Sequence, residues 1–124
     1  MNVVITLPRD LIDKIISGEK TLEMRKGMPT FLLGVDGFFV IEKGTDIVRC
    51  FCRVDDYLCP LPQGCEVWAS FLCVSKDFVR NYCKKAKRIW LWQIGNVTKL
   101  AGLRRCHLCL EKNPQSFVYT SYRL

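Results

Sequence analysis

The segment GEKTLEMRKG, residues 18–27, places a lysine, a carboxylate and an arginine close together just after a short apolar helix. Side chains alternate between the two faces of an extended strand, so Thr21, Glu23 and Arg25 are expected on one face. At ~3.4 Å per residue, these side chains and Lys20 lie within about 7–14 Å of one another. Such a cluster can hold a phosphate, hydrogen-bond the edge of a base or move a proton. The alternative interpretation is a solvated strand face whose ion pair adds little to stability.

The residues before this segment have the periodicity of a helix. Apolar residues recur at helical spacing after Pro8, which suits a first helical turn, and Gly18 is a natural helix stop. A helix that ends in Gly-x-Lys and is followed by x-x-Glu-x-Arg resembles the opening of ASCH domains, which are small β-barrels of the PUA-like superfamily. The positions that fit this signature are Gly18, Lys20, Glu23 and Arg25. A second stretch, IWLWQIGNVTKL at residues 89–100, is similar to the late barrel strand of the family.

The rest of the chain predicts short strands and a few helices. Runs of β-branched and aromatic residues predict strands at residues 3–7, 21–26, 38–41, 47–54, 89–94 and 117–119. Residues 97–109 are predicted to continue as a strand or bulged strand. Helices are predicted over residues 66–73 and after an N-cap at Ser75. The buried stripe expected on the second of these helices consists of Phe78, Val79, Tyr82, Cys83 and Ala86.

Five to six short, mostly antiparallel strands with two to three helices predict an α+β barrel rather than a parallel sheet. The resemblance agrees with this fold class and implies a single ASCH, PUA-like domain over residues 1–124. A chain of this length is expected to bury one core, and a hydrophobic fraction of 49% is too high for a disordered chain. Apolar runs stay shorter than the roughly 18 residues of a membrane span, and the N-terminus shows no secretory signal. We therefore expect a soluble, cytoplasmic protein that does not enter a membrane.

The charge is basic and unevenly distributed. Nineteen Lys and Arg residues against twelve Asp and Glu residues give a net charge of +7, which attracts polyanions such as RNA or DNA. The basic groups are Lys84, Lys85, Lys87 and Arg88; Arg104 and Arg105; and Lys20, Arg25 and Lys26. Two simpler explanations are a solubility surface and, for the first group, complementation of a helix dipole at its C-terminus.

The eight cysteines are expected to be reduced thiols, because no signal peptide directs the chain to an oxidising compartment. Cys50 and Cys52 are expected on one side of a strand, and Cys73 and Cys83 are expected to pack as small core residues. We expect neither a metal nor another cofactor.

Cys106 and Cys109 form the one CxxC pair, which is half of the usual zinc pattern, so a structural zinc held by Cys106 and Cys109 is an alternative. The single histidine, His107, argues against a Ser-His-Asp hydrolase.

Two tryptophans alternate along the late strand. Trp90 and Trp92 share one face, while Ile89 and Leu91 share the other. Paired tryptophans can stack on bases, but large aromatic residues in a small barrel more commonly fill the core. We favour the core for both.

The resemblance implies an RNA-binding module. ASCH relatives are thought to bind RNA in a cleft beside the Gly-x-Lys segment, so Lys20 and Arg25 would contact a phosphate or a base acceptor. Glu23 would accept a hydrogen bond from a base amine or orient Arg25, and Thr21 would add a hydroxyl contact. A small barrel cleft cannot read the groove of a duplex, so the expected ligand is a single-stranded or flipped base. The residues expected to add affinity through phosphates are Lys26, Lys84, Lys85, Lys87, Arg88, Arg104 and Arg105.

Two alternative functions stand beside RNA binding. Some small ASCH proteins hydrolyse the amide of N4-acetylcytidine with a lysine, a threonine and a glutamate, and Lys20 matches that lysine. Glu23 stands in place of the threonine. Leu72 stands near the catalytic acid, where the closest carboxylates are Glu66 and Asp77. If the chain is a nucleoside amidohydrolase, Lys20 and Glu23 are the expected catalytic pair, because a desolvated lysine beside a carboxylate can relay a proton to water. The second alternative is a Cys-rich, zinc-stabilised module that binds a protein.

Overall fold

A single curled sheet organises the part of the chain that the computed structural model describes, residues 1–30 and 33–124. Its strands are β1 (Asn2–Leu7), β2 (Leu22–Arg25), β3 (Gly37–Glu42), β4 (Val48–Leu58), β5 (Trp90–Lys99) and β6 (Val118–Thr120). The α-helices are α1 (Arg9–Ser17), α2 (Ala69–Leu72) and α3 (Lys76–Lys84), and two 3₁₀ helices are η2 (Cys65–Trp68) and η3 (Arg105–Leu108). These elements confirm the α+β class. None of the described helices is long and apolar enough to cross a membrane.

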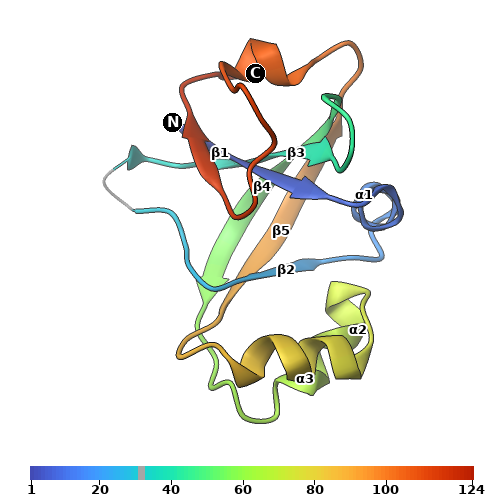
Figure 1. Ribbon diagram of the computed structural model, residues 1–124, viewed down its shortest axis with the longest axis vertical. Helices are drawn as coiled ribbons and strands as arrows, with labels where there is room; N and C mark the ends of the chain where they lie inside the picture. The colour runs from blue at the N-terminus through green and yellow to red at the C-terminus, as the bar shows by residue number, and fades with distance from the viewer. Residues whose placement is uncertain (31–32) are drawn as a thin grey trace.

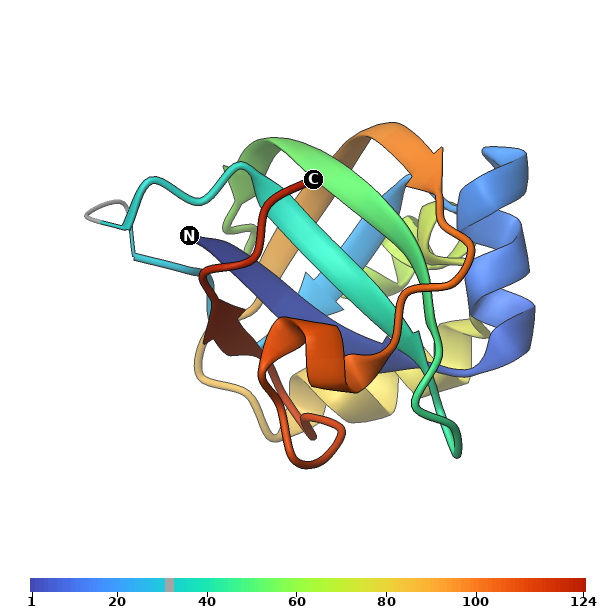
Figure 2. The same ribbon diagram turned by 90° about the horizontal axis from the view of Figure 1, so that it is seen from above.

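The sheet forms a half-barrel with the strand order β2-β5-β4-β3-β1-β6. β1 and β3 pair in parallel and the other neighbours pair antiparallel, as expected for a mostly antiparallel barrel. The parallel pair requires a crossover, which α1 and β2 supply. Figure 1 shows α3 at one end of the long axis and η3 at the other, and Figure 2 shows β4 and β5 curving across the sheet.

Both faces of the sheet are buried, because hydrophobic residues follow one another along the strands instead of alternating with polar ones. In β5, Trp92 packs in one core with α1, while Leu91 packs in a second core with α2 and α3. Trp92 is completely buried and its indole Nε1 donates a hydrogen bond to the Gly27 carbonyl at 3.1 Å. Trp90 packs half-buried against the same core. The core assignment of both tryptophans is confirmed.

The predicted helix ends are also confirmed. Gly18 adopts a φ of 87°, which a residue with a Cβ rarely adopts, and its N–H donates to the Ile15 carbonyl at 3.1 Å. Ser75 caps α3 by accepting a hydrogen bond from the Phe78 N–H at 3.0 Å. On α3, Val79 and Cys83 are buried as predicted, whereas Phe78 is 54% exposed. Tyr82 and Ala86 are partly buried against the same core as Val79 and Cys83, so of the five predicted residues Phe78 alone departs from the stripe.

Two predicted element boundaries are wrong. β4 continues beyond residue 54 to Leu58, because register shifts between Cys52 and Asp56 let the strand bend while it stays paired with β5. β5 ends at Lys99, and the segment predicted to continue as a strand instead forms η3. There, the Arg104 N–H donates to His107 Nδ1 at 2.9 Å, so the lone histidine serves as a local cap.

We expect Gly37→Ala to lower the free energy of unfolding by about 1–3 kcal/mol or more, since 1–3 kcal/mol is the usual penalty for overpacking. A Cβ at this position would lie 2.0 Å from the Cys52 carbonyl oxygen, a backbone atom that cannot move aside without breaking the pairing of β3 with β4. Urea unfolding measures the change. The control is Gly27→Ala, whose Cβ would meet Phe117 at 3.6 Å, an ordinary contact. Equal stability of the two variants would contradict the prediction.

Tyr57 should make stability depend on pH above about pH 10. Burial raises the pKa of Tyr57 to about 12 from 10.0, with a smaller contribution from Tyr119. The folded state therefore holds the phenol proton more tightly, so this stabilisation is complete below pH 10 and is lost as the pH rises through 12.

The test is Tyr57→Phe, compared with the parent protein by urea unfolding between neutral pH and pH 12. The variant should lose less stability above pH 10. At neutral pH it should be as stable as the parent or more so, because the buried Tyr57 hydroxyl has no hydrogen-bond partner among the described residues. Identical pH profiles would refute this role for Tyr57.

Candidate functional site

A buried ion network lies between α1, β2 and α2. The Glu23 carboxylate forms an ion pair with Lys20 Nζ at 3.1 Å through Oε1 and accepts a hydrogen bond from Arg25 Nε at 2.7 Å through Oε2. Lys20 is 2% exposed and Glu23 is 5% exposed. Two cations share one carboxylate, so the cluster carries a formal charge of +1 in a largely desolvated position.

Lys20 Nζ donates two hydrogen bonds besides its ion pair with Glu23. They run to the carbonyls of Leu22 at 2.5 Å and Leu72 at 3.1 Å. Leu22 belongs to β2, the edge strand of the sheet, and Leu72 ends α2. The ammonium therefore joins a helix to the sheet edge and holds the carboxylate in place. These contacts are typical of a lysine that holds neighbouring groups in position.

Arg25 retains hydrogen-bonding capacity. Its Nη1 donates to the Ser116 carbonyl at 3.2 Å, which ties the network to the segment before β6. Its Nη2 has no acceptor in residues 1–30 or 33–124, and Glu23 accepts a hydrogen bond from Arg25 through Oε2 while Oε1 forms the ion pair with Lys20, so the carboxylate keeps lone pairs for a further donor. The site thus offers donors from Arg25 next to an acceptor from Glu23.

The network forms the polar end of a cavity of about 190 Å³. This volume is below the range of about 300–1,000 Å³ that is typical of pockets for drug-sized ligands, so the cavity suits a group of one ring system. Apolar side chains make up most of its wall, and two aromatic rings from α3, Phe78 and Tyr82, face one another at 6.4 Å in a stacked arrangement. The cavity lining is Leu7, Leu11, Lys20, Glu23, Met24, Arg25, Leu72, Val74, Phe78 and Tyr82.

Solved structures share this arrangement of strands and helices. The crystal structure of ASCH from Zymomonas mobilis superposes with a TM-score of 0.78 at 16% sequence identity, covering 95% of this chain and 86% of that chain. The chain has the ASCH-domain fold.

Two variants of the same Zymomonas protein have this ASCH fold as well. A serine-to-alanine variant has a TM-score of 0.75, 16% identity and coverage of 95% of this chain and 87% of that chain. A tyrosine-to-phenylalanine variant has the same TM-score and identity, with 95% and 88% covered. No protein-family sequence model matches the chain, and no curated protein matches it at a significant level. The likeness at 16% identity therefore concerns the fold.

Thr21 does not line this cavity of the ASCH fold. It precedes β2, its N–H donates to the Phe71 carbonyl at 3.0 Å, and its carbonyl accepts from the Ile94 N–H at 2.9 Å. Its side chain lines a separate groove on the other side of the contact between α2 and β2. The alternation rule places Thr21 beside Glu23 only if residue 21 is part of the strand, and the strand begins at Leu22.

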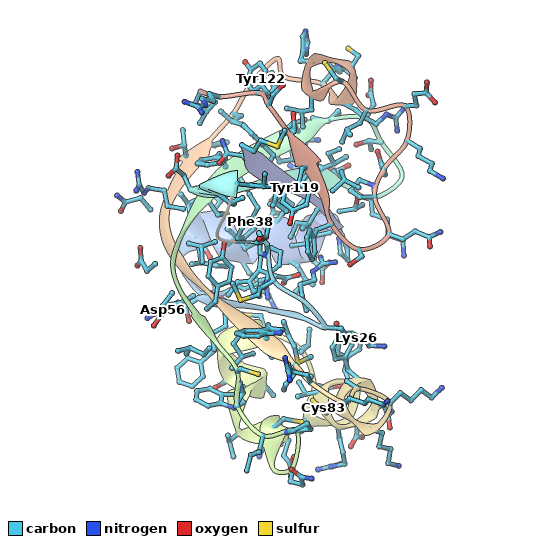
Figure 3. The ribbon with its side chains drawn as sticks, turned by 90° about the vertical axis from the view of Figure 1, so that its left-hand side faces the viewer. Lys26, Phe38, Asp56, Cys83, Tyr119 and Tyr122 are labelled. Atoms are coloured by element: carbon cyan, nitrogen blue, oxygen red, sulfur yellow. The ribbon has the colours of Figure 1, made fainter. Side chains whose placement is uncertain are left out.

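The predicted basic residues occupy different ends of the molecule. Lys26 lies 5.3 Å from the centre of the Tyr82 ring, at the edge of the cavity, and Figure 3 shows it beside α3. The group at the end of α3, which the structure leaves exposed, is Lys84, Lys85, Lys87 and Arg88. Arg104 and Arg105 lie with η3 at the opposite end (Figure 1). Arg104 pairs with Asp46 at 2.7 Å, and Arg105 donates to Asn113 at 2.7 Å.

The cysteines are free thiols in the structure. Cys50 and Cys52 are fully buried in the same core, as predicted, and Cys83 is also buried. Cys73 differs from the prediction, since it is half-buried and ends α2 with a φ of 58°. The helix ends there, which moves its side chain out of the core.

Both cysteines of the CxxC pair are exposed: Cys106 lies in η3 and Cys109 follows directly after it. Among the described residues, no group of three or more His, Cys, Asp or Glu side chains is arranged to hold a metal ion.

Sequence reasoning missed the aromatic wall of the cavity. Phe78 belongs to the predicted buried stripe of α3, but it is 54% exposed and lines the cavity beside Tyr82, which is partly buried against the same core as Val79 and Cys83. The available signal was that the apolar residues of α3 cover a wide part of the helix surface, so those at its margin can contact a second neighbour.

We expect Lys20→Met to lower the free energy of unfolding by about 3–5 kcal/mol, because one oxygen of Glu23 loses its cation and the carbonyls of Leu22 and Leu72 lose their donor in a buried position. Urea unfolding at neutral pH is the measurement. Arg80→Met is the control: it breaks the exposed pair with Asp77 at 2.7 Å and should change stability by less than about 1 kcal/mol. If Lys20→Met were as mild as the control, the network would not stabilise the fold.

Proposed function

We propose that this domain binds single-stranded RNA and takes one unstacked base into the cavity between α1, β2 and α3. The observation that supports this most directly is the pairing of an aromatic, apolar wall with a charged donor and acceptor at one end. A nucleobase has the same division, with apolar faces and a polar edge. Single-stranded RNA is recognised in this way, by stacking on aromatic rings and hydrogen bonding to exposed edges.

In the proposed complex, the base faces lie against Phe78 and Tyr82. Burial raises the pKa of the Tyr82 phenol, so the ring stays neutral at physiological pH and presents an uncharged face. Arg25 donates to a carbonyl or ring nitrogen of the base, and Glu23 accepts from an amino or imino group. Lys20 acts on the ligand through Glu23, whose carboxylate it holds in position.

The phosphates on either side of the bound base lie along the basic end of α3. Lys26 stands at the cavity edge, and four exposed cations follow at the end of the helix: Lys84, Lys85, Lys87 and Arg88. None of these five residues forms an ion pair with another described residue. They remain available to phosphates and supply sequence-independent affinity that falls as salt rises. Arg104 and Arg105, at the far end, add long-range attraction.

Hydrolysis of an acylated nucleoside is the alternative use of the same cavity. The contact of Lys20 with Glu23 at 3.1 Å is the pair that a proton relay would use. However, Glu23 is the one carboxylate among the described residues that line the cavity, while Glu66 and Asp77 lie outside it. The lining also has no serine, threonine or cysteine to act as a nucleophile. These features favour binding over hydrolysis.

The test is a titration of short, labelled single-stranded RNAs followed by fluorescence anisotropy, at low and high salt. Arg25→Gln should weaken binding by about 10–100-fold, which is the effect of losing a charged hydrogen bond. Lys43→Gln is the control, since Lys43 is an exposed cation in the turn between β3 and β4 and should leave affinity within about threefold. Replacing Lys84 and Lys85 together by Gln should weaken binding to all sequences equally and flatten the salt dependence.

Unchanged affinity of a folded Arg25→Gln protein would remove the cavity from the binding site. Incubation with N4-acetylcytidine, followed by chromatography of the products, separates the two functions. Release of cytidine that Lys20 and Glu23 variants abolish would favour the amidohydrolase, whereas RNA binding without product would favour the module.

A further inference from the structure

A second hollow lies across the contact between α2 and β2 from the cavity. This β4–α2 groove has a volume of about 370 Å³, and its apolar lining consists of Leu22, Leu58, Trp68, Phe71 and Ile94. Two neutral polar side chains, Thr21 and Gln93, complete it. The groove is built from the end of β4, the interior of β5 and the start of β2, together with η2 and α2, so most of its lining belongs to regular elements rather than to loops.

Large apolar side chains in the groove are open to solvent. Phe71 is 48% exposed and Leu58 is 36% exposed. The rings of Trp68 and Phe71 lie 6.3 Å apart at an angle of 51°, which presents two aromatic faces side by side. Clustered exposed apolar residues of this kind mark interaction surfaces, and aromatic residues are the common anchors of protein interfaces.

The charge around the groove is opposite to that of the whole protein. Among the residues that the structure describes, no lysine or arginine lines it, although the chain has a net charge of +7. Asp56 pairs in register with Gln93 of β5 and lies two residues before Leu58 in β4, so the three side chains lie on the same face of the sheet. A Cβ on Gly95 would lie 2.3 Å from Asp55 Oδ1, which places that carboxylate over β5 next to Ile94.

Both carboxylates can pair with a cation of a partner, although Asp56 Oδ1 also accepts a hydrogen bond from the Tyr57 N–H at 2.8 Å. Asp55 and Asp56 are exposed, and neither forms an ion pair with any other described residue. Figure 3 shows Asp56 projecting outward from the curved ribbon of β4 and β5. The groove therefore has an apolar floor and an acidic rim.

We propose that the β4–α2 groove binds a short segment of a partner protein that presents a large apolar side chain beside a lysine or arginine. The apolar side chain lies between Leu58, Trp68 and Phe71, and the cation pairs with Asp55 or Asp56. Charge complementarity excludes the phosphate backbone of a nucleic acid from this surface, because an acidic rim repels it. This site is separate from the proposed base cavity and leaves that cavity accessible.

The first experiment selects binders of the intact protein from a short random-peptide library displayed on phage, with an unrelated basic protein as the reference. Enriched peptides should combine an aromatic or large aliphatic residue with a neighbouring Lys or Arg. The best peptide is then synthesised with a label, together with a version in which each Lys and Arg is replaced by Glu. Anisotropy titrations with the two peptides measure affinity.

Three variants locate the binding. Phe71→Ser should weaken the basic peptide by at least about tenfold, as expected for an aromatic anchor. Asp56→Lys should weaken the basic peptide and improve binding of its Glu version. Leu61→Ser is the matched control, because Leu61 is 77% exposed and lies outside the groove, and it should bind like the parent. Melting temperatures show that each variant is folded, and RNA binding by Phe71→Ser should equal that of the parent.

Several results would overturn the proposal. They are the absence of enriched peptides over the reference protein, enrichment of acidic or wholly polar peptides, and full affinity in the Phe71→Ser variant. Sedimentation of the free protein provides a further test: a dimer that Phe71→Ser dissociates would show that a second copy of the chain covers the groove instead. Failure of RNA binding in the earlier titration would leave this proposal standing, since the groove and the cavity have no side chain in common.

Discussion

The arrangement of this fold depends on the contacts that the Lys20 ammonium group makes. This group joins the carbonyl of an edge strand, the carbonyl at the end of α2 and the carboxylate of Glu23. Edge strands expose unpaired backbone groups, and lysine is one of the residues that protect them. Here the Lys20 side chain points inward and donates a hydrogen bond to the Leu22 carbonyl of the edge strand. One ammonium group therefore positions the edge strand, α2 and the Glu23 carboxylate.

These contacts also explain why two hollows lie side by side. Residues 20–23 and 71–72 form a wall with a hollow on either side: Lys20, Glu23 and Leu72 line the cavity, whereas Thr21, Leu22 and Phe71 line the groove. The charges follow the same division. The cavity has a buried formal charge of +1 with exposed cations nearby, and the groove has two unpaired carboxylates. One wall thus separates a surface that attracts polyanions from a surface that repels them.

Local periodicity predicted the elements that local interactions control. The Gly18 stop, the Ser75 cap and the two-face burial of residues 89–92 follow from backbone conformation and alternation within a few residues, and the structure confirms them. The resemblance in residues 18–25 predicted the fold, which the solved structures share. The prediction of secondary structure failed where contacts with residues distant in the sequence determine the backbone conformation. Residues 105–108 leave the sheet for a 3₁₀ helix whose first backbone N–H, that of Arg105, donates to the Asp46 carbonyl at 2.8 Å.

The sequence by itself determined which residues are basic, which stretches form the strands of the sheet and the helices α1 and α3, and that Lys20, Glu23 and Arg25 lie within reach of one another. Only the tertiary structure decided what each of them does. Lys20 bonds to a residue 52 positions away and Arg25 to one 91 positions away, and such contacts leave no local periodic pattern. The aromatic wall of the cavity and the acidic rim of the groove depend in the same way on how α3 and β4 pack against the sheet. Alternation and helical spacing assign a side chain to a face, whereas the partner on that face comes from chain segments that fold back from far along the sequence.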